Sequence, residues 1–214
     1  MLREIMAMTH KARPRICFVP TASADSKGSI DKWGKTCAEL DIDTIVLKVW
    51  VSSGPGNKSF EDILLNCDAI FVGGGNTLNM MGIWRAQGID TLLIKAYNQG
   101  IILAGGSAGA ICWFCKGISD SRPTALSAVE GLGILPYSVC PHHDNATRPA
   151  LHQQLIEKDE MTDGYALDGS AAIVFRNGKV AECISWKEGH KAYSVKKDKH
   201  GKITERALQM RTLQ

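Results

Sequence analysis

A serine flanked by glycines is the residue of this sequence best suited to chemistry. The segment from Gly105 to Gly109 reads Gly-Gly-Ser-Ala-Gly, and its serine is Ser107. This spacing fits G-x-S-x-G, in which a strand turns sharply into a helix and the serine lies at the apex. The neighbours of the apex must be small, because the backbone there is strained and closely packed. An apolar run precedes the segment and a helix-compatible run follows it, so Ser107 is a candidate nucleophile.

A glycine-rich loop offers the polar groups that a serine nucleophile requires. Residues 73–77 read Gly-Gly-Gly-Asn-Thr and follow a buried apolar run. Backbone N–H groups of this loop, at Gly74, Gly75 and Asn76, are candidates to bind the negatively charged oxygen of a tetrahedral intermediate. The alternative is a phosphate- or nucleotide-binding loop or a simple turn, although the sequence has neither the Lys-Ser/Thr pair of a Walker motif nor a Rossmann fingerprint.

Histidine is the usual base for a serine nucleophile. Of six histidines, His142 and His143 directly follow an apolar run and Pro141, where a loop at the carboxyl end of a strand is expected, and Asp144 comes next. The other four lie in polar terminal segments or surface-like contexts. A metal site is the weaker interpretation, because neighbouring residues seldom share one metal and no H-E-x-x-H or H-x-x-x-H spacing occurs. Its ligands would be His142, His143, Asp144 and His152.

The composition is that of a globular protein. The chain has 214 residues, 44% hydrophobic and 22% charged, with a formal net charge of +3. We expect no nucleic-acid partner, because the only concentrated basic run, at residues 196–200, has no interleaved aromatic side chains. We also expect no membrane association, since no apolar run is long enough to cross a bilayer and the N-terminus has no signal-peptide core.

The seven cysteines are odd in number and scattered, mostly inside apolar runs. This usage is typical of reduced thiols and favours a cytoplasmic protein over a disulfide-bonded one. Cys112 and Cys115 form a C-x-x-C pair within an expected helix over residues 108–116. Because bulky apolar residues surround the pair, we expect it to pack in the core and to have no redox role.

Alternating helices and strands are expected to position these residues. Helices are predicted over residues 1–13, 30–40, 60–66, 76–87, 92–98, 108–116 and 150–158. Strands are predicted over 15–20, 43–50, 69–72, 101–104, 133–139, 164–167, 171–175 and 179–185, with a hairpin at Asn177-Gly178, an added edge strand at 193–195, and an irregular segment over 119–129.

This order predicts an α/β fold with a mostly parallel sheet, helices on both of its faces and a C-terminal hairpin. Functional loops of such sheets lie beyond the carboxyl ends of the strands. We expect a single domain over residues 1–214, with its core over roughly 15–195 and a weakly specified tail over 196–214.

Taken together, the motifs resemble the peptidase E and cyanophycinase family of serine hydrolases, whose fold is like that of class I glutamine amidotransferases. The resemblance spans roughly residues 15 to 195. The segments that carry it are Phe-Val-Pro-Thr-Ala-Ser at 18–23, Val-Gly-Gly-Gly-Asn-Thr at 72–77, Gly-Ser-Ala-Gly-Ala at 106–110, and Gly-Leu-Gly-Ile-Leu-Pro at 131–136 leading into Pro141-His142.

The resemblance implies that Ser107 is the nucleophile and His142 the general base. It implies that backbone N–H groups of the Gly74/Gly75 loop and of Ala108 hold the oxyanion. Such chemistry requires neither a metal nor an organic cofactor.

The third catalytic residue has three candidates. In some members of the family, an aspartate follows shortly after the helix that begins at the nucleophilic serine. The corresponding residue here is Asp120. Others place an acid in a late strand-end motif, where an ungapped alignment puts Gly169 at the acidic position and Asp168 one residue early. A shift of one residue along a strand reverses the side-chain direction. Asp144 is a local third option.

The family includes aspartyl dipeptidase-like enzymes and cyanophycin-cleaving exopeptidases, which implies a small peptide or amide substrate cut beside an acidic side chain. The candidate cations for that side chain are Arg85, Lys116, Arg122 and Arg148. The alternative function is an inactive, amidotransferase-like small-molecule-binding protein that lacks its third acid, as Gly169 would permit.

The N-terminus differs from the family pattern, in which a strand and a glycine-rich loop usually precede the first helix. This sequence begins directly in the helix. The absence of that strand would leave a sheet edge exposed. We therefore expect either a homodimer or an N-terminally shortened version of the family fold.

Overall fold

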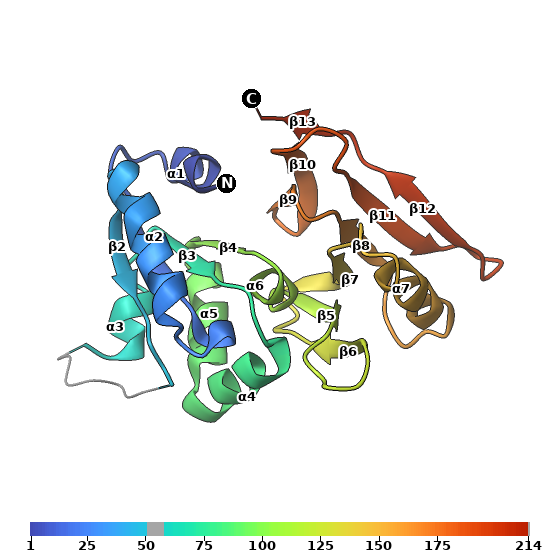
Figure 1. The fold of residues 1–214 in the computed structure, drawn as a ribbon, viewed down its shortest axis with the longest axis horizontal. Coiled ribbons are helices and arrows are strands. Elements are labelled where there is room, and N and C mark those ends of the chain that lie inside the picture. The colour runs from blue at the N-terminus through green and yellow to red at the C-terminus, as the bar shows by residue number, and fades with distance from the viewer. Residues whose placement is uncertain (51–57, 214) are drawn as a thin grey trace. The chain divides into compact units, whose positions relative to one another are not determined.

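The chain folds as two units, Met1–Ala110 and Ile111–Gln214, and each has its own main sheet (Figure 1). The computed structural model describes residues 1–50 and 58–213. The expected α/β class, with mostly parallel strands and helices packed against them, is confirmed. The prediction of a single domain stays a prediction.

The sheet of the first unit is entirely parallel, in the order β2-β1-β3-β4. Its strands are β1 Arg15–Val19, β2 Asp43–Val46, β3 Ala69–Val72 and β4 Ile102–Gly105. All four were expected, although β2 ends earlier than the predicted Trp50. Their short apolar runs are typical of strands covered on both faces.

Helices connect these strands, as parallel pairing requires. They are α1 Leu2–Thr9, the 3-10 turn η1 Thr21–Ser23, α2 Lys27–Glu39, α3 Phe60–Leu64, α4 Thr77–Gln87, α5 Ile89–Asn98 and α6 Ala108–Ile111. Side chains define several of their ends. Ser59 and Asp62 form a capping box at α3, and Asn76 caps α4. Gly88, in the left-handed conformation at φ 71°, ends α4 and begins α5.

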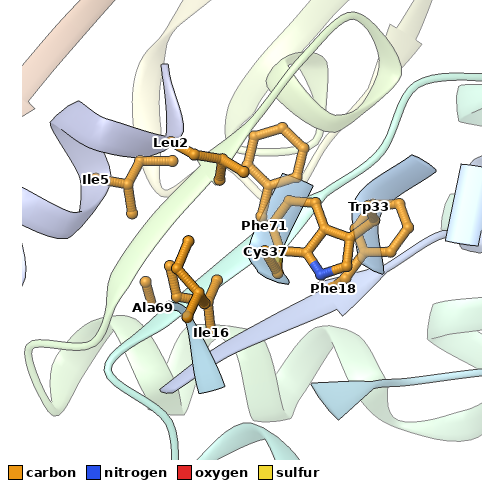
Figure 2. Close-up of a cluster of buried hydrophobic side chains, with 9 residues drawn as sticks. Leu2, Ile5, Ile16, Phe18, Trp33, Cys37, Ala69 and Phe71 are labelled. Carbon is orange, nitrogen blue, oxygen red and sulfur yellow. The ribbon is translucent and has the colours of Figure 1, made fainter. Parts of the chain in front are cut away.

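An aromatic cluster lies where α1 and α2 pack on one face of this sheet (Figure 2). Trp33 of α2 stacks on Phe18 of β1, with ring centroids 4.6 Å apart, and on Phe71 of β3 at 5.2 Å. Leu2 and Ile5 of α1 belong to the same cluster. The core therefore begins before residue 15, which corrects the predicted boundary.

The opposite face of the sheet is buried as well. Cys17, Ile70 and Val72 alternate with the residues of the aromatic cluster and are completely buried. Helix α5 packs against both α3 and α4, and these helices cover this face (Figure 1). Both faces of the first sheet are thus covered by helices, as expected.

The main sheet of the second unit has the order β12-β11-β8-β7-β5-β6. Its three central strands, β5 Phe114–Ser119, β7 Leu135–Pro141 and β8 Gly164–Leu167, are parallel, whereas β6 Ser127–Glu130, β11 Ala192–Lys197 and β12 Ile203–Ala207 pair antiparallel. Helix α7, Arg148–Glu157, packs on β5, β7, β11 and β12.

A smaller sheet completes this unit. Strands β9 Ala171–Arg176 and β10 Lys179–Ser185 form an antiparallel hairpin, and β13 Arg211–Thr212 pairs with β10. Asn177 and Gly178 connect the hairpin with φ angles of 51° and 73°. These are the left-handed angles that an Asn-Gly hairpin turn requires, so the predicted hairpin is confirmed.

The predicted helix over residues 108–116 is wrong. Helix α6 ends at Ile111, and β5 begins at Phe114. The following backbone is pulled into tertiary pairing, because the carbonyl oxygens of Cys112 and Cys115 accept hydrogen bonds from Leu132 N, at 2.7 Å, and Gly131 N, at 3.0 Å. Carbonyls committed to a distant segment are not available to a continuing helix.

Three further predictions for the second unit need correction, because strand pairing decided these segments. The segment 119–129, predicted to be irregular, contributes β6. The predicted edge strand at 193–195 is part of β11, which lies between β8 and β12. The predicted tail over 196–214 contains β12 and β13.

Candidate active site

Ser107 lies at the turn between β4 and α6, as the sequence pattern predicts. Its φ angle is 57°, in the left-handed region that residues other than glycine seldom adopt. Two hydrogen bonds close the turn around it, from Gly109 N to Gly106 O at 3.0 Å and from Ala110 N to Ser107 O at 2.9 Å. A residue held in a strained conformation by its surroundings is characteristic of functional sites.

The two outer glycines of the motif are required by close packing. A Cβ atom at Gly105 would overlap the carbonyl oxygen of Gly109 and lie 2.9 Å from that of Val72. A Cβ atom at Gly109 would overlap the carbonyl oxygen of Val72. The turn around Ser107 therefore packs directly against the end of β3. This close contact explains why the first and last positions of the G-x-S-x-G pattern are glycine.

The glycine-rich loop lies beside the serine. Strands β3 and β4 pair in parallel with Val72 opposite Gly105, so the segments that follow them leave the sheet side by side. A Cβ atom at Gly74 would lie 3.2 Å from the Cβ of Ser107. The backbone of Gly74 is thus in contact with the serine, as an oxyanion loop must be.

Some backbone N–H groups of this loop are hydrogen-bonded within the fold, and others are available to bind a ligand. Gly73 N donates to Val19 O at 3.1 Å, and Asn76 N donates to Ala22 O at 2.7 Å. Within the described residues, the N–H groups of Gly74 and Gly75 make no backbone hydrogen bond. They are the donors of this loop that remain for a ligand.

Asn76 has a structural role that the sequence analysis did not assign. Its side-chain oxygen accepts a hydrogen bond from Asn79 N at 2.9 Å and so caps helix α4, while its own N–H binds Ala22. The backbone N–H of Asn76 is therefore not available to an oxyanion.

A buried aspartate that the sequence analysis missed binds the backbone of the segment that follows β2. Asp25 follows η1 and is 8% exposed. Its Oδ2 accepts hydrogen bonds from Val49 N at 2.7 Å and Trp50 N at 2.8 Å, beyond the end of β2. An aspartate after a run of small residues carries no signal of such long-range contacts.

In the second unit, His142 directly follows β7 and has a φ angle of 56°. Gly117 of β5 lies opposite Val139 of β7, and these parallel strands end at Ser119 and Pro141, directly before Asp120 and His142. On the other side, Pro141 pairs with Leu167 of β8, which places Asp168 next to His142. The histidine is therefore flanked by two carboxylate-bearing strand ends.

Asp168 is hydrogen-bonded to the backbone of Lys191, which joins the end of β8 to the start of β11. Its Oδ2 accepts a hydrogen bond from Lys191 N at 2.8 Å, and its own N–H donates to Lys191 O at 3.0 Å. Lys191 directly precedes β11, on the side of β8 away from β7. The carboxylate of Asp168 is thus directed away from the strand that carries His142.

Asp144 is likewise occupied, because its Oδ1 accepts from Gly169 N at 3.1 Å and its Oδ2 lies 3.9 Å from His190 Nδ1. Asp120 differs from both. Its side chain is 74% exposed, and its Oδ2 accepts from Arg148 Nη2 at 3.0 Å. Of the three candidate acids, Asp120 is therefore the one not bound to the backbone of a neighbouring strand.

The other histidines of the suggested metal set have separate partners. His143 Nε2 lies 3.1 Å from Glu205 Oε1, and His152 Nε2 lies 2.8 Å from Ser138 Oγ. Within the described residues, no group of three or more histidine, cysteine or acidic side chains is arranged to hold a metal ion.

Neither member of the cysteine pair lies in a helix, since Cys112 is in the turn between α6 and β5 and Cys115 is in β5. Cys112 is buried and Cys115 is partly exposed. Cys112 is completely buried, and this burial raises the pKa of its thiol well above the ordinary value. A thiol with a raised pKa is unreactive, which supports a packing role.

Comparison with known proteins identifies the family. The model of peptidase family S51 matches residues 1–183. The chain belongs to peptidase family S51. The predicted resemblance is thereby confirmed, and membership makes this chain a peptidase, that is, a hydrolase.

Individual relatives agree with the family assignment. A Bacillus subtilis protein described as the uncharacterized peptidase YgaJ is 38% identical over 198 residues, covering 92% of this chain and 84% of the relative. Peptidase E of Streptomyces coelicolor is 27% identical over 161 residues, covering 70% of this chain and 63% of the relative.

A solved structure shows the same fold as this S51 chain. The crystal structure of a peptidase from an acI-B1 Actinobacterium has a TM-score of 0.72 and 17% sequence identity, covering 97% of this chain and 86% of the other.

The candidate cations of this S51 chain differ in how they are engaged. Lys116 Nζ donates to Glu160 O at 3.0 Å, and Arg148 is paired with Asp120. Arg122 is exposed in the segment between β5 and β6.

Among helices of the described residues, none has the length and apolar character needed to span a membrane.

Proposed function

We propose that the chain is a serine-type peptidase in which Ser107 attacks the carbonyl carbon of a small peptide-like amide. The observation that carries the proposal is the elbow itself. Ser107 is held in the left-handed conformation at the end of β4, and the backbone of Gly74 lies against it. A serine in this position presents its oxygen at the carboxyl end of the sheet, where substrates of α/β enzymes bind.

The proposed oxyanion site uses the N–H groups that the fold leaves available. Those of Gly74 and Gly75 belong to the loop beside the serine. Ala108 follows Ser107 as the first residue of α6, so its N–H has no partner within that helix. Donors fixed before the reaction stabilise the charge on the tetrahedral intermediate without reorganising.

His142 is the proposed general base. It takes the proton of Ser107 during the attack and returns it to the leaving amine, which leaves an ester on the serine oxygen. Water, deprotonated by the same imidazole, then releases the acid and restores the serine. Asp120 is the proposed orienting acid, since it directly follows β5, the strand that pairs with β7 ahead of His142. Among the described residues, its carboxylate binds Arg148 and no backbone group of a neighbouring strand.

We further propose that the substrate carries an acidic side chain beside the cleaved bond. Arg122 is the best candidate to bind it, because Lys116 and Arg148 already have partners in the second unit. Arg122 follows Asp120 by two residues and is exposed, so its guanidinium is available to a carboxylate.

The test of the nucleophile compares Ser107→Ala with Ser29→Ala, a serine of helix α2 used as the control. A fluorophosphonate probe should label the wild type and the control, and Ser107→Ala should show neither labelling nor hydrolysis of acidic dipeptides. Circular dichroism should show the same fold for all three. Labelling of Ser107→Ala at the wild-type rate would contradict the proposal, and so would a wild type that is neither labelled nor active.

A further inference from the structure

Arg148 makes an unusual pair of contacts at the end of β5. It is the first residue of helix α7, and its side chain is 6% exposed. Nη1 donates to Ile118 O at 3.1 Å, and Nη2 donates to Asp120 Oδ2 at 3.0 Å. One planar guanidinium therefore binds the main chain of β5 and, two residues later, the carboxylate that follows the strand.

This arrangement fixes Asp120 in direction as well as in place. The Asp120 side chain is 74% exposed, so packing alone would leave it free to rotate. The guanidinium is a rigid fork whose donors keep a constant geometry, in contrast to the flexible ammonium of lysine. Because its other arm is bound to Ile118 O, the fork sets the carboxylate relative to the end of β5, the strand that pairs with β7 ahead of His142.

Stability alone explains the buried arginine poorly. Burying a guanidinium is costly unless all of its donors are satisfied. Arg148 Nε is buried and has no hydrogen-bond partner among the described residues. The Cys140 thiol lies within the electrostatic influence of Arg148. Burial raises the pKa of this thiol to about 12, and the positive charge of Arg148 opposes part of that rise. Because burying this guanidinium costs free energy of folding, we expect Arg148 to have a role in the candidate active site.

We propose that Arg148 is the positioning residue of Asp120, holding its carboxylate directed for contact with the imidazole of His142. It is not the cation that binds an acidic substrate, since both of its Nη groups are already engaged. The inference rests on the proposed function, in which Asp120 orients His142.

The first test is a double-mutant cycle of Asp120→Asn and Arg148→Met, with Arg148→Lys as the conservative variant. If Arg148 acts through Asp120, Arg148→Met lowers kcat roughly 10- to 100-fold with little change in KM. The double variant is then no slower than Asp120→Asn alone. Arg148→Lys keeps the charge and recovers part of the loss, because lysine lacks the second arm.

Two results would overturn the inference. In the first, the two substitutions have multiplicative effects on kcat, which means that they act independently. In the second, Arg148→Met raises KM for acidic dipeptides only, which means that the arginine binds substrate. Thermal unfolding of every variant shows whether it is folded, and Arg148→Lys takes the place of Arg148→Met in the cycle if the methionine variant is not.

A second measurement does not depend on hydrolysis. Carbon-13 labelling of histidine gives the ring chemical shifts of His142 by nuclear magnetic resonance. Asp120→Asn should change these shifts in the wild-type background, because it removes the carboxylate proposed to contact the imidazole. The same substitution should change them much less in the Arg148→Met background, where the carboxylate is no longer held in that direction. Equal changes in the two backgrounds would overturn the role of Arg148, even if Ser107 proved not to be a nucleophile.

Discussion

Ser138 Oγ lies 2.8 Å from His152 Nε2, in a buried hydrogen bond that joins β7 to α7. Both side chains are completely buried. Burial lowers the pKa of His152 from 6.5 to about 4, with a smaller contribution from His143 in the same direction. The imidazole is therefore neutral in the folded protein at neutral pH, and this makes the stability of the second unit dependent on pH.

The first prediction concerns that dependence. Above pH 6.5, His152 is neutral in both the folded and the unfolded chain. As the pH falls from 6.5 towards 4, the unfolded chain binds a proton at His152 and the folded chain does not. The free energy of unfolding should fall in this window, by at most about 3 kcal/mol from this group.

Urea unfolding at several pH values measures the effect. Because other groups titrate in the same range, the informative quantity is the difference between the wild type and His152→Gln, which should lose less stability on acidification. His200→Gln, an exposed histidine near the C-terminus, is the matched control and should follow the wild type. Identical slopes for the wild type and His152→Gln between pH 4.5 and 6.5 would exclude this role.

The second prediction concerns glycines of the elbow. Gly105→Ala should destabilise the protein by several kcal/mol, on the order of 3 or more, because its Cβ would overlap backbone atoms that have nowhere to move. Gly34→Ala, in the exposed interior of helix α2, meets no atom within 4 Å and should stabilise it by about 0.5–1 kcal/mol. Chemical denaturation compares the two, and equal effects would contradict the packing argument.

The third prediction concerns strain at the nucleophile. Ser107→Gly should be more stable than Ser107→Ala, by up to about 1 kcal/mol, since glycine adopts a φ of 57° without the penalty of a Cβ. Both variants should be inactive. Differential scanning calorimetry provides the comparison, and an alanine variant as stable as the glycine variant would show that the turn is unstrained.

The fourth prediction concerns Asp25, whose carboxylate accepts two backbone hydrogen bonds. Asp25→Ala leaves Val49 N and Trp50 N without their acceptor and should cost roughly 2–4 kcal/mol. Asp25→Asn keeps a carbonyl oxygen and should cost less. The unfolding free energies of the two variants check this order, and equal losses would mean that only the negative charge matters and not the hydrogen bonds.

The fifth prediction concerns substrate choice. Arg122→Gln should raise KM for a dipeptide with an acidic side chain roughly tenfold and leave a neutral analogue unaffected, because one exposed charge-assisted contact is lost. Lys199→Gln, in the exposed turn between β11 and β12, controls for the change in net charge. Equal changes in KM for both dipeptides would mean that Arg122 does not select the substrate.

Several parts of the fold could be predicted because their signals are local. The strands of the first unit are short apolar runs bounded by polar or glycine-rich segments, and Asn177-Gly178 is a turn by its backbone preferences alone. Ser107 was found because a strained elbow and its close packing restrict nearby positions to glycine or alanine. These requirements act on the residues themselves, so the pattern is visible without the fold.

The missed elements depend on distant partners. Helix α6 ends early because carbonyl groups near Cys112 pair with the segment around Gly131, and β13 forms because it pairs with β10. In both cases the partner segment is distant in the sequence. Local propensity therefore had no information about them, and tertiary pairing overrode it.

The sequence by itself determined the family motifs, the elbow serine and the histidine at a strand end. Only the tertiary structure separated the three candidate acids. Asp168 and Asp144 are committed to backbone groups, whereas the carboxylate of Asp120 is bound by the Arg148 side chain. A carboxylate's role depends on which atoms its oxygens contact, and those contacts arise from strand register and packing, which no single stretch of sequence specifies.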